Sequence, residues 1–300
     1  MASYIVFNIQ LLPANSKKNK EVGNFGYKKL FEGLSISTIQ AFKKKNINVI
    51  SYPLANDTFF APASNIIADD HAYGQFLKYD RSDTVDDLYT NKQLFQASPG
   101  TFPVANRFSF DYVFDYETHR LAVAELSGRL PKPSVCNDAI LSFLSPVAAS
   151  LFPSYVLTVN IVSDPTELQS VLASAEGFKS VSATLTFPNG HKLGRQLQEL
   201  KDNNVHHLKV EASTESKDSV MPNLPEFLRE IVEASTDYGK TSIAYIKEEG
   251  GRLCRYITSK YPLKIQLRMK KGEQPAEMRR RVMQAVRSLR DPDAEEHDNV

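Results

Sequence analysis

The strongest structural constraint in the sequence is a strict alternation of side-chain types over residues 107–117. Aromatic residues occupy every second position, namely Phe108, Phe110, Tyr112, Phe114 and Tyr116. The positions between them carry Ser109, Asp111, Val113, Asp115 and Glu117. Because successive side chains point to opposite faces in a pleated strand, the pattern predicts a β-strand with one aromatic face and one largely polar face.

The first half of the chain adds further elements of both kinds. Residues 3–12 alternate and are rich in β-branched side chains, which predicts a strand. Residues 27–45 predict a helix that ends in three lysines, where cations suit the helix dipole. The apolar side of this helix is formed by Leu30, Phe31, Leu34, Ile36, Ile39 and Phe42. Residues 48–82 predict a meander of antiparallel strands, and residues 83–98 predict a short helix or loop.

The later segments continue this mixture. A strand at 121–126 is expected to pair with residues 107–117, and a helix capped by Ser134 or Asn137 follows, with Pro146 as a kink or end. Further strands are predicted at 155–163, 180–187, 205–211, 241–247, 252–258 and 263–269. Further helices are predicted at 165–175, 190–203, 224–234 and 275–290. The apolar stripe of the last helix is formed by Met278, Val282, Ala285, Val286 and Leu289.

The order of elements predicts an α+β fold made of two mixed α/β domains with largely antiparallel sheets. We expect a β-rich domain over residues 1–130 and an α/β domain over residues 131–290. Residues 291–300 are acidic and contain Pro292, which predicts a disordered tail.

Composition narrows the class of protein. The chain has 36 Lys+Arg against 35 Asp+Glu, which excludes a uniformly basic nucleic-acid protein, and its 42% hydrophobic content is sufficient for real cores. No stretch approaches the roughly 18 apolar residues of a membrane span, and no signal peptide is evident, so we expect a cytoplasmic, soluble protein without a membrane partner. Cys136 and Cys254 are far apart in the sequence, which argues against a disulfide framework or a cysteine zinc site.

Several tempting motifs are incomplete. Gly239-Lys240-Thr241-Ser242 resembles the end of a phosphate-binding loop, but Ala234 stands where that loop needs glycine. Gly23-Asn24-Phe25-Gly26 has the spacing of an RNA-clamping loop, but it lies between a predicted strand and a predicted helix. The histidines show no metal-binding spacing, and no nucleophile elbow or Cys-x-x-Cys occurs. We therefore predict no metal and no cofactor.

The polar face of the strand over 107–117 is one candidate site. Asp111, Asp115 and Glu117 project to the same side, and the last two would be able to share a magnesium ion, as hydrolytic nucleases require. The alternative is a half-buried strand whose polar face is simply solvated. Asp69 and Asp70, like Asp86 and Asp87, are expected to be ordinary solvent-facing carboxylates.

The charge distribution supplies the second candidate. Residues 1–50 hold eight basic and two acidic residues, and residues 251–300 hold twelve and seven, whereas the middle of the chain is acidic. Lys264, Arg268 and Lys270 are predicted to share one face of the strand over 263–269. Arg280 and Arg287 are predicted to lie opposite the apolar stripe of the last helix, with Arg279, Arg281 and Arg290 on its flanks. The predicted phosphate-binding residues are Lys264, Arg268, Lys270, Lys271, Arg279, Arg280, Arg281 and Arg287.

Such cations would be able to follow a phosphate backbone, with Tyr256 and Tyr261 available to stack. Binding of this kind would tolerate any base sequence, because no recognisable base-reading module is present. The alternative is a solvated helix of mixed charge, since arginine is also a good helix former.

Four stretches, Phe108 to Asp115, Gly128 to Pro131, Leu157 to Asn160 and Met221 to Leu224, resemble an uncharacterised bacterial family carried on mobile and defence islands. In its order of elements the chain is similar to the phage-exclusion protein RexA. RexA and the DNA-binding subunit of the Kiwa system imply a two-domain, dimeric, sequence-nonspecific DNA binder in anti-phage defence. The resemblance transfers no functional residue by position.

Three functions follow as expectations. The first is a non-enzymatic, homodimeric protein that binds double-stranded DNA through its basic carboxy-terminal surface. The second is a magnesium-dependent nuclease or toxin that uses Asp111, Asp115 and Glu117. The third is a protein-interaction subunit of a larger defence complex, encoded in the same operon as its partner.

Overall fold

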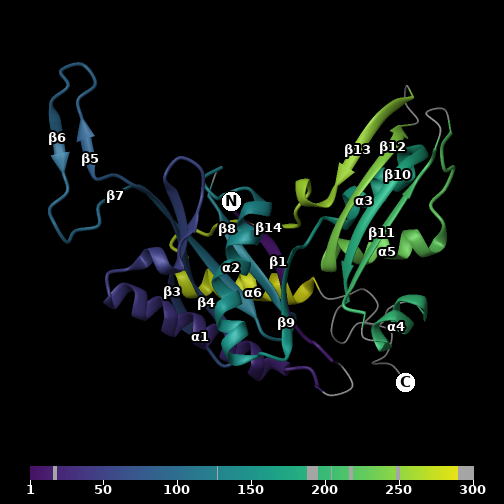
Figure 1. Ribbon diagram of the computed structural model, residues 1–300, viewed down its shortest axis with the longest axis horizontal. Coiled ribbons are helices and arrows are strands. Elements are labelled where there is room, and N and C mark those ends of the chain that lie inside the picture. The colour runs from purple at the N-terminus through teal and green to yellow at the C-terminus, as the bar shows by residue number, and fades with distance from the viewer. Residues whose placement is uncertain are drawn as a thin grey trace.

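A computed structural model describes residues 1–15, 19–126, 128–187, 195–203, 205–215, 219–247 and 251–289 of the chain. Within these ranges the fold is α+β with largely antiparallel sheets, as the sequence predicts (Figure 1). The expected acidic tail at residues 291–300 lies outside the described residues.

The larger sheet has the strand order β14-β1-β8-β7-β4-β3-β2, and β9 also pairs with β1. Its strands are β1 (Ala2–Pro13), β2 (Tyr52–Pro53), β3 (Thr58–Ile67), β4 (His71–Arg81), β7 (Val104–Asp115), β8 (Arg120–Glu125), β9 (Tyr155–Ile161) and β14 (Lys264–Leu267). The pairing predicted between residues 107–117 and 121–126 is confirmed, with Tyr112 opposite Val123. Strand β14 pairs with residues 2–5 of β1, and β9 pairs with residues 7–13. These two late strands therefore share one strand as a partner.

Two helices, α1 (Gly23–Lys43) and α2 (Pro133–Leu151), cover the aromatic face of this sheet. Phe110, Tyr112 and Phe114 of β7 are buried there, and the ring of Phe31 stacks on Phe114 at 4.4 Å between centroids. The predicted aromatic face thus forms the centre of the largest core. By contrast, Ile36, Ile39 and Phe42, which the sequence places on the apolar side of α1, are exposed.

The opposite face of the sheet is covered by the carboxy-terminal helix α6 (Pro275–Ser288). Val282, Met283 and Val286 of this helix pack with Tyr4, Val6, Val113 and Ala122 of the sheet. The expectation of a solvated polar face was therefore wrong around Val113. Apolar residues from β1 and β8 extend this face beside Val113, and their proximity is not visible in the sequence of β7 alone.

The smaller sheet has the order β11-β10-β12-β13 and forms a second core. Its strands are β10 (Ala175–Thr186), β11 (His207–Ser213), β12 (Gly239–Lys247) and β13 (Arg252–Ile257). Leu168 of α3 (Pro165–Ser174), Leu197 of α4 (Arg195–Asp202) and Ile231 of α5 (Glu226–Tyr238) belong to this core. The predicted helix over 190–203 is described only from residue 195 onward.

The larger sheet with its helices and the smaller sheet with its helices form two bodies. The boundary between them does not fall at residue 130, where the sequence predicts it. Helix α2 and strand β9 belong to the first core, and β14 and α6 return to the first sheet. Residues 164–260 are therefore inserted between β9 and β14 (Figure 1). The crossing segments lie side by side, because Leu263 N donates to Val162 O and Asp164 N donates to Tyr261 O.

The sequence predicts that no segment is apolar enough to span a membrane, and helix α2 contradicts this prediction. Pro133–Leu151 is long and apolar enough by composition, and it is the one such helix in the described part of the chain. Its residues in the first core are Cys136, Ala139, Ile140, Phe143, Leu144, Val147 and Ala148. The helix is thus apolar because it forms part of a core.

A short hairpin, β5 (Thr84–Asp86) and β6 (Gln93–Gln96), replaces the helix or loop expected at 83–98. The backbone turn is fixed by Asp87, whose carboxylate accepts hydrogen bonds from Tyr89 N at 3.1 Å and Thr90 N at 2.7 Å. Val85 then stands opposite Phe95 across the hairpin. Figure 1 shows this hairpin projecting away from the rest of the molecule.

Candidate nucleic-acid interface and carboxylate strand face

The predicted cations lie along the edge strand β14, the loop that follows it and α6, which crosses one face of the larger sheet. Residues 264–281 contain seven Lys+Arg and two Asp+Glu. Because β14 ends at Leu267, Lys264 is the only one of the three predicted strand cations that lies in a strand. The expected row of Lys264, Arg268 and Lys270 on one strand face is therefore wrong.

Four of the eight predicted cations form ion pairs. Lys264 Nζ lies 2.9 Å from Glu125 Oε2, Lys270 Nζ lies 3.2 Å from Glu277 Oε1, and Arg281 Nη1 lies 2.6 Å from Glu273 Oε1. The Glu273 side chain is nearly buried, and the hydrogen bond from Arg281 holds the pKa of its carboxyl below the usual range. The fourth is Arg287, which binds Asp115 and Asp70.

Arg279 is also engaged, with its guanidinium carbon 3.9 Å from the centre of the Tyr73 ring. The two tyrosines predicted to assist phosphate binding, one in β13 and one in the segment that leads to β14, stack on each other with 5.4 Å between ring centroids. Tyr256 is buried in the second core. It is therefore not available to stack on a base.

Five of the predicted cations are exposed, and three of these, Arg268, Lys271 and Arg280, remain after the paired Lys264 and Lys270 are set aside. None of these three forms an ion pair with a residue in the described ranges. Both terminal nitrogens of Arg281 donate to the carbonyl of Arg268 at 3.1 Å, which ties the loop that carries Arg268 and Lys271 to the helix that carries Arg280. We call Arg268, Lys271 and Arg280 the free cation cluster.

Arg287 occupies a different side of α6 from the one predicted. It follows Met283 by four residues, and Met283 is buried against the sheet although the predicted stripe omits it. Residues four apart lie on the same helical face. Arg287 consequently reaches the sheet, although 39% of its side chain stays exposed.

Asp115 is the most buried of the predicted carboxylates, with an exposure of 0%. Its Oδ1 accepts from Arg287 Nε at 3.0 Å and Nη2 at 2.8 Å. Its Oδ2 accepts from Thr118 N at 2.9 Å and Thr118 Oγ1 at 2.7 Å. Both carboxylate oxygens are therefore satisfied by the protein, and Arg287 supplies the opposite charge.

Asp111 and Glu117 lie elsewhere. Asp111 is exposed and accepts from Gln75 Nε2 at 2.8 Å, while Glu117 is exposed in the turn after β7. Asp111 and Asp115 are separated along the strand by about 13 Å at roughly 3.3 Å per residue. In the described ranges no three His, Cys, Asp or Glu side chains are grouped so that they would hold a metal.

The sequence gives no signal for the part played by Asp70. This residue, expected to be an ordinary solvent-facing carboxylate, accepts from His71 Nδ1 at 2.7 Å and Arg287 Nη2 at 2.7 Å. The two hydrogen bonds, that from His71 first, lower the pKa of Asp70 to about 2. Asp70 and Asp115 together hold Arg287, although they lie in different parts of the sequence.

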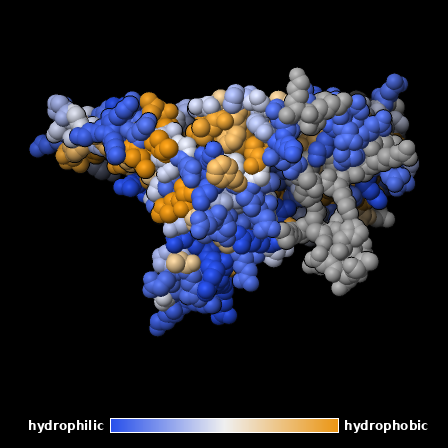
Figure 2. Space-filling view, turned by 90° about the horizontal axis from the view of Figure 1, so that it is seen from below, coloured by the Kyte–Doolittle hydropathy of each residue, from blue (hydrophilic) through white to orange (hydrophobic). Residues whose placement is uncertain are grey.

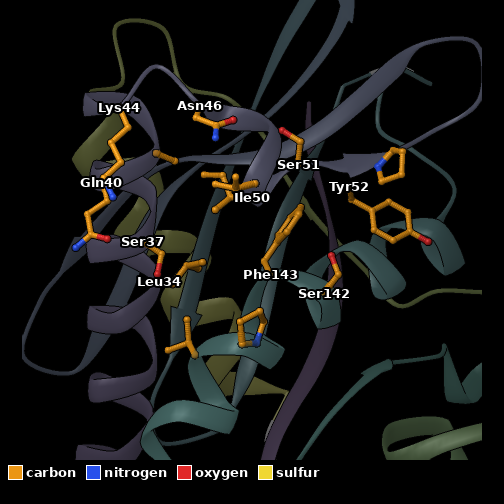
Figure 3. A pocket seen from close by; sticks show the side chains of 15 residues that line it. Leu34, Ser37, Gln40, Lys44, Asn46, Ile50, Ser51, Tyr52, Ser142 and Phe143 are labelled. Atoms are coloured by element: carbon orange, nitrogen blue, oxygen red, sulfur yellow. The ribbon is translucent and has the colours of Figure 1, made fainter.

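Two depressions lie in the described surface, and the first of them is lined by residues named above. One, of about 720 Å³, lies at the amino-terminal end of α6 and includes Tyr4, Tyr73, Asp111 and Arg279 in its wall. Burial and the charge of Asp111 raise the pKa of Tyr4. The other, of about 610 Å³, lies between α1, α2 and the segment 46–53 (Figure 3).

One family model, described as Domain of unknown function (DUF4747), matches residues 2–286 of the chain. A search of curated proteins finds no match to the chain.

Proposed function

We propose that this chain, which belongs to the DUF4747 family, is a non-enzymatic protein that binds double-stranded DNA without strong sequence specificity. The observation that carries the proposal is the free cation cluster, Arg268, Lys271 and Arg280, exposed beside ion pairs that fix its surroundings. The proposal narrows the predicted interface from eight cations to three.

The ion pairs give the cluster a defined geometry. Glu273 and Glu277 engage Arg281 and Lys270, which ties the loop after β14 to α6. The three remaining side chains are exposed and form no ion pair within the described part of the chain. Contacts from such groups to phosphates supply affinity and release counterions, and they read no base sequence.

The setting that we propose is the cytoplasm of a bacterial cell, in defence against phage. The resemblance of the sequence to families of defence islands and to RexA supports this setting. No observation favours the nuclease alternative, because Asp115 is neutralised by Arg287 and Asp111 lies apart from it.

The test is a titration of a labelled DNA duplex at several salt concentrations, with and without magnesium. In the triple variant Arg268→Glu, Lys271→Glu, Arg280→Glu, we expect the affinity to fall and the salt dependence to flatten. Each lost phosphate contact lowers the slope of log affinity against log salt by about 0.9, so the slope should fall by about 3 if all three residues contact phosphates.

The matched control reverses three exposed cations of the other body, in the variant Lys240→Glu, Arg255→Glu, Lys260→Glu. Both triple variants change the net charge of the protein by the same amount. A general charge effect would therefore weaken DNA binding equally in the two variants. Equal losses in the two variants, or unchanged binding in the first, would refute the proposal. Magnesium-dependent cleavage of the duplex would instead support the nuclease alternative.

A further inference from the structure

The β5–β6 hairpin and its flanks, residues 82–103, form an arm that has almost no core of its own. Five large apolar side chains on it are exposed, namely Val85, Leu88, Tyr89, Leu94 and Phe95. Leu88 is 82% exposed and Tyr89 is 91% exposed, both at the tip. The described part of the chain therefore leaves the apolar side chains of the arm uncovered.

Such an arm needs an external partner. A two-stranded hairpin alone in water is at best marginally stable, because it buries too little apolar surface. Contiguous exposed apolar patches on soluble proteins commonly mark contact surfaces. The arm thus has the properties of an element that packs against another surface.

The same chain presents a matching surface at the carboxy-terminal end of α1. The groove of about 610 Å³ is open there, with Leu34, Ile50 and Phe143 in its wall. Figure 3 shows Phe143 of α2 pointing into the space between α1 and the segment that carries Ile50. Val49 adds an exposed apolar side chain to the wall of this groove. In Figure 2, apolar side chains gather over the left half of the molecule, where the arm and this end of α1 lie in Figure 1.

The charges of the two surfaces are complementary. The arm, residues 82–103, carries Asp83, Asp86 and Asp87 against Lys92, and Asp83 also pairs with Arg81 at 3.3 Å at the base of the arm. The groove segment, residues 36–53, carries Lys43, Lys44 and Lys45 and no acidic residue. Opposite charges at the edges of an apolar contact orient the partners and suppress wrong pairings.

We propose that the arm of one copy of this chain docks in the α1–α2 groove of a second copy, and that the second copy returns the same contact. Such an exchange is isologous, so it closes as a twofold dimer and buries both apolar surfaces at once. Each arm has 22 residues, which is comparable to the roughly 20–30 residues per side of a standard interface. The homodimer expected from the sequence thereby gains a specific interface.

The first experiment is sedimentation equilibrium of the full chain without DNA, which keeps it independent of the function proposed above. We expect a dimer. In the variant Tyr89→Ser, Leu94→Ser the dissociation constant should rise more than about tenfold, because central apolar anchors dominate such interfaces. Both residues lie outside the cores, so the circular dichroism spectrum should be retained, and the melting temperature should match that of the natural chain when both are monomeric at high dilution.

The second experiment exchanges the charges. An arm variant, Asp83→Lys with Asp86→Lys, and a groove variant, Lys43→Glu with Lys44→Glu, should each dimerise more weakly than the natural chain. Asp87 is left unchanged because it fixes the turn. Mixed in equal amounts, the two variants should form a heterodimer, because both of its contacts again join opposite charges.

The third experiment traps the contact between differently tagged chains that carry Cys254→Ser. Leu88→Cys in the arm of one chain should form an interchain disulfide with Gln40→Cys in the groove of the other. Lys209→Cys on β11 serves as the control position and should not form one. A monomeric natural chain, a dimer that the arm variant leaves intact, or equal cross-linking to the control would overturn the proposal, and a different protein would then have to cover the arm.

Discussion

The guanidinium of Arg287 donates two hydrogen bonds to one oxygen of the buried carboxylate of Asp115, across 172 residues of sequence. This contact fastens α6 to the larger sheet at the end of β7. The sequence predicts that Arg287 binds phosphate and that Asp115 is a candidate metal ligand. The contact between them gives both residues a structural role. In the structure the charge and the hydrogen bonds of each residue are directed at the other.

We predict that Arg287→Met destabilises the protein strongly. Removing Arg287 leaves Asp115, whose side chain is 0% exposed, without its opposite charge, and this costs about 3 kcal/mol, because 39% of the Arg287 side chain is exposed and the pair is not fully buried. The free energy of unfolding from urea denaturation measures this loss. Arg280→Met, on the exposed side of the same helix, should change that free energy by less than about 0.5 kcal/mol. Equal losses in the two variants would show that the contact with Asp115 contributes nothing specific.

The pKa of Asp70 predicts a dependence of stability on pH. Hydrogen bonds from His71 and Arg287 lower this pKa from 3.8 to about 2, so the folded state binds the proton less readily than the unfolded chain does. The resulting stabilisation is fully present above the unfolded pKa and is lost as the pH falls from about 4 to about 2. Because 59% of the side chain is exposed, we expect it to be at most about 1 kcal/mol.

The comparison that isolates this contribution is between the natural chain and Asp70→Asn, both measured as free energy of unfolding against pH. The difference between them should be constant above about pH 5 and should shrink between pH 4 and pH 2. A difference that stays constant down to pH 2 would contradict the assignment.

Gly239 gives a third prediction. This residue begins the sequence that resembles a phosphate-binding loop, but in the structure it opens β12, where an added Cβ would collide with the backbone carbonyl of Thr184 on β10. Gly239→Ala should therefore destabilise the protein by about 1–3 kcal/mol through overpacking. Lys240→Ala, at the neighbouring exposed position, is the control and should be near neutral. An alanine variant as stable as the natural chain would mean that the close approach is not needed.

The sequence predicts well what depends on local periodicity. The aromatic face of β7 follows from a two-residue period, and Val282 and Val286 of α6 follow from a helical one. It fails where the outcome depends on a distant neighbour. Lys264 binds Glu125, which is 139 residues away in the sequence, and Arg287 binds Asp115, which is 172 residues away. The segment predicted to form a free basic surface is therefore partly neutralised.

The lack of a local signal for distant contacts also explains why the hairpin of the arm and the division into domains were not predicted from the sequence. Residues 83–98 carry no clear periodicity, and their hairpin depends on the turn at Asp87 and the pairing of Val85 with Phe95. The division at residue 130 followed a break in the sequence pattern. It could not anticipate that β9 and β14 both pair with β1, because strand partners far apart in sequence leave no local signal.

The insertion of residues 164–260 between β9 and β14 has a consequence for synthesis on the ribosome. The smaller body is complete before β14 and α6 have been made, whereas the larger sheet awaits both of them. Its α6-facing side, including Val6, Val113 and Asp115, therefore stays uncovered until the last part of the described chain emerges. Contacts of such long sequence separation are slow to form, so this side is the surface of the nascent chain most in need of a chaperone.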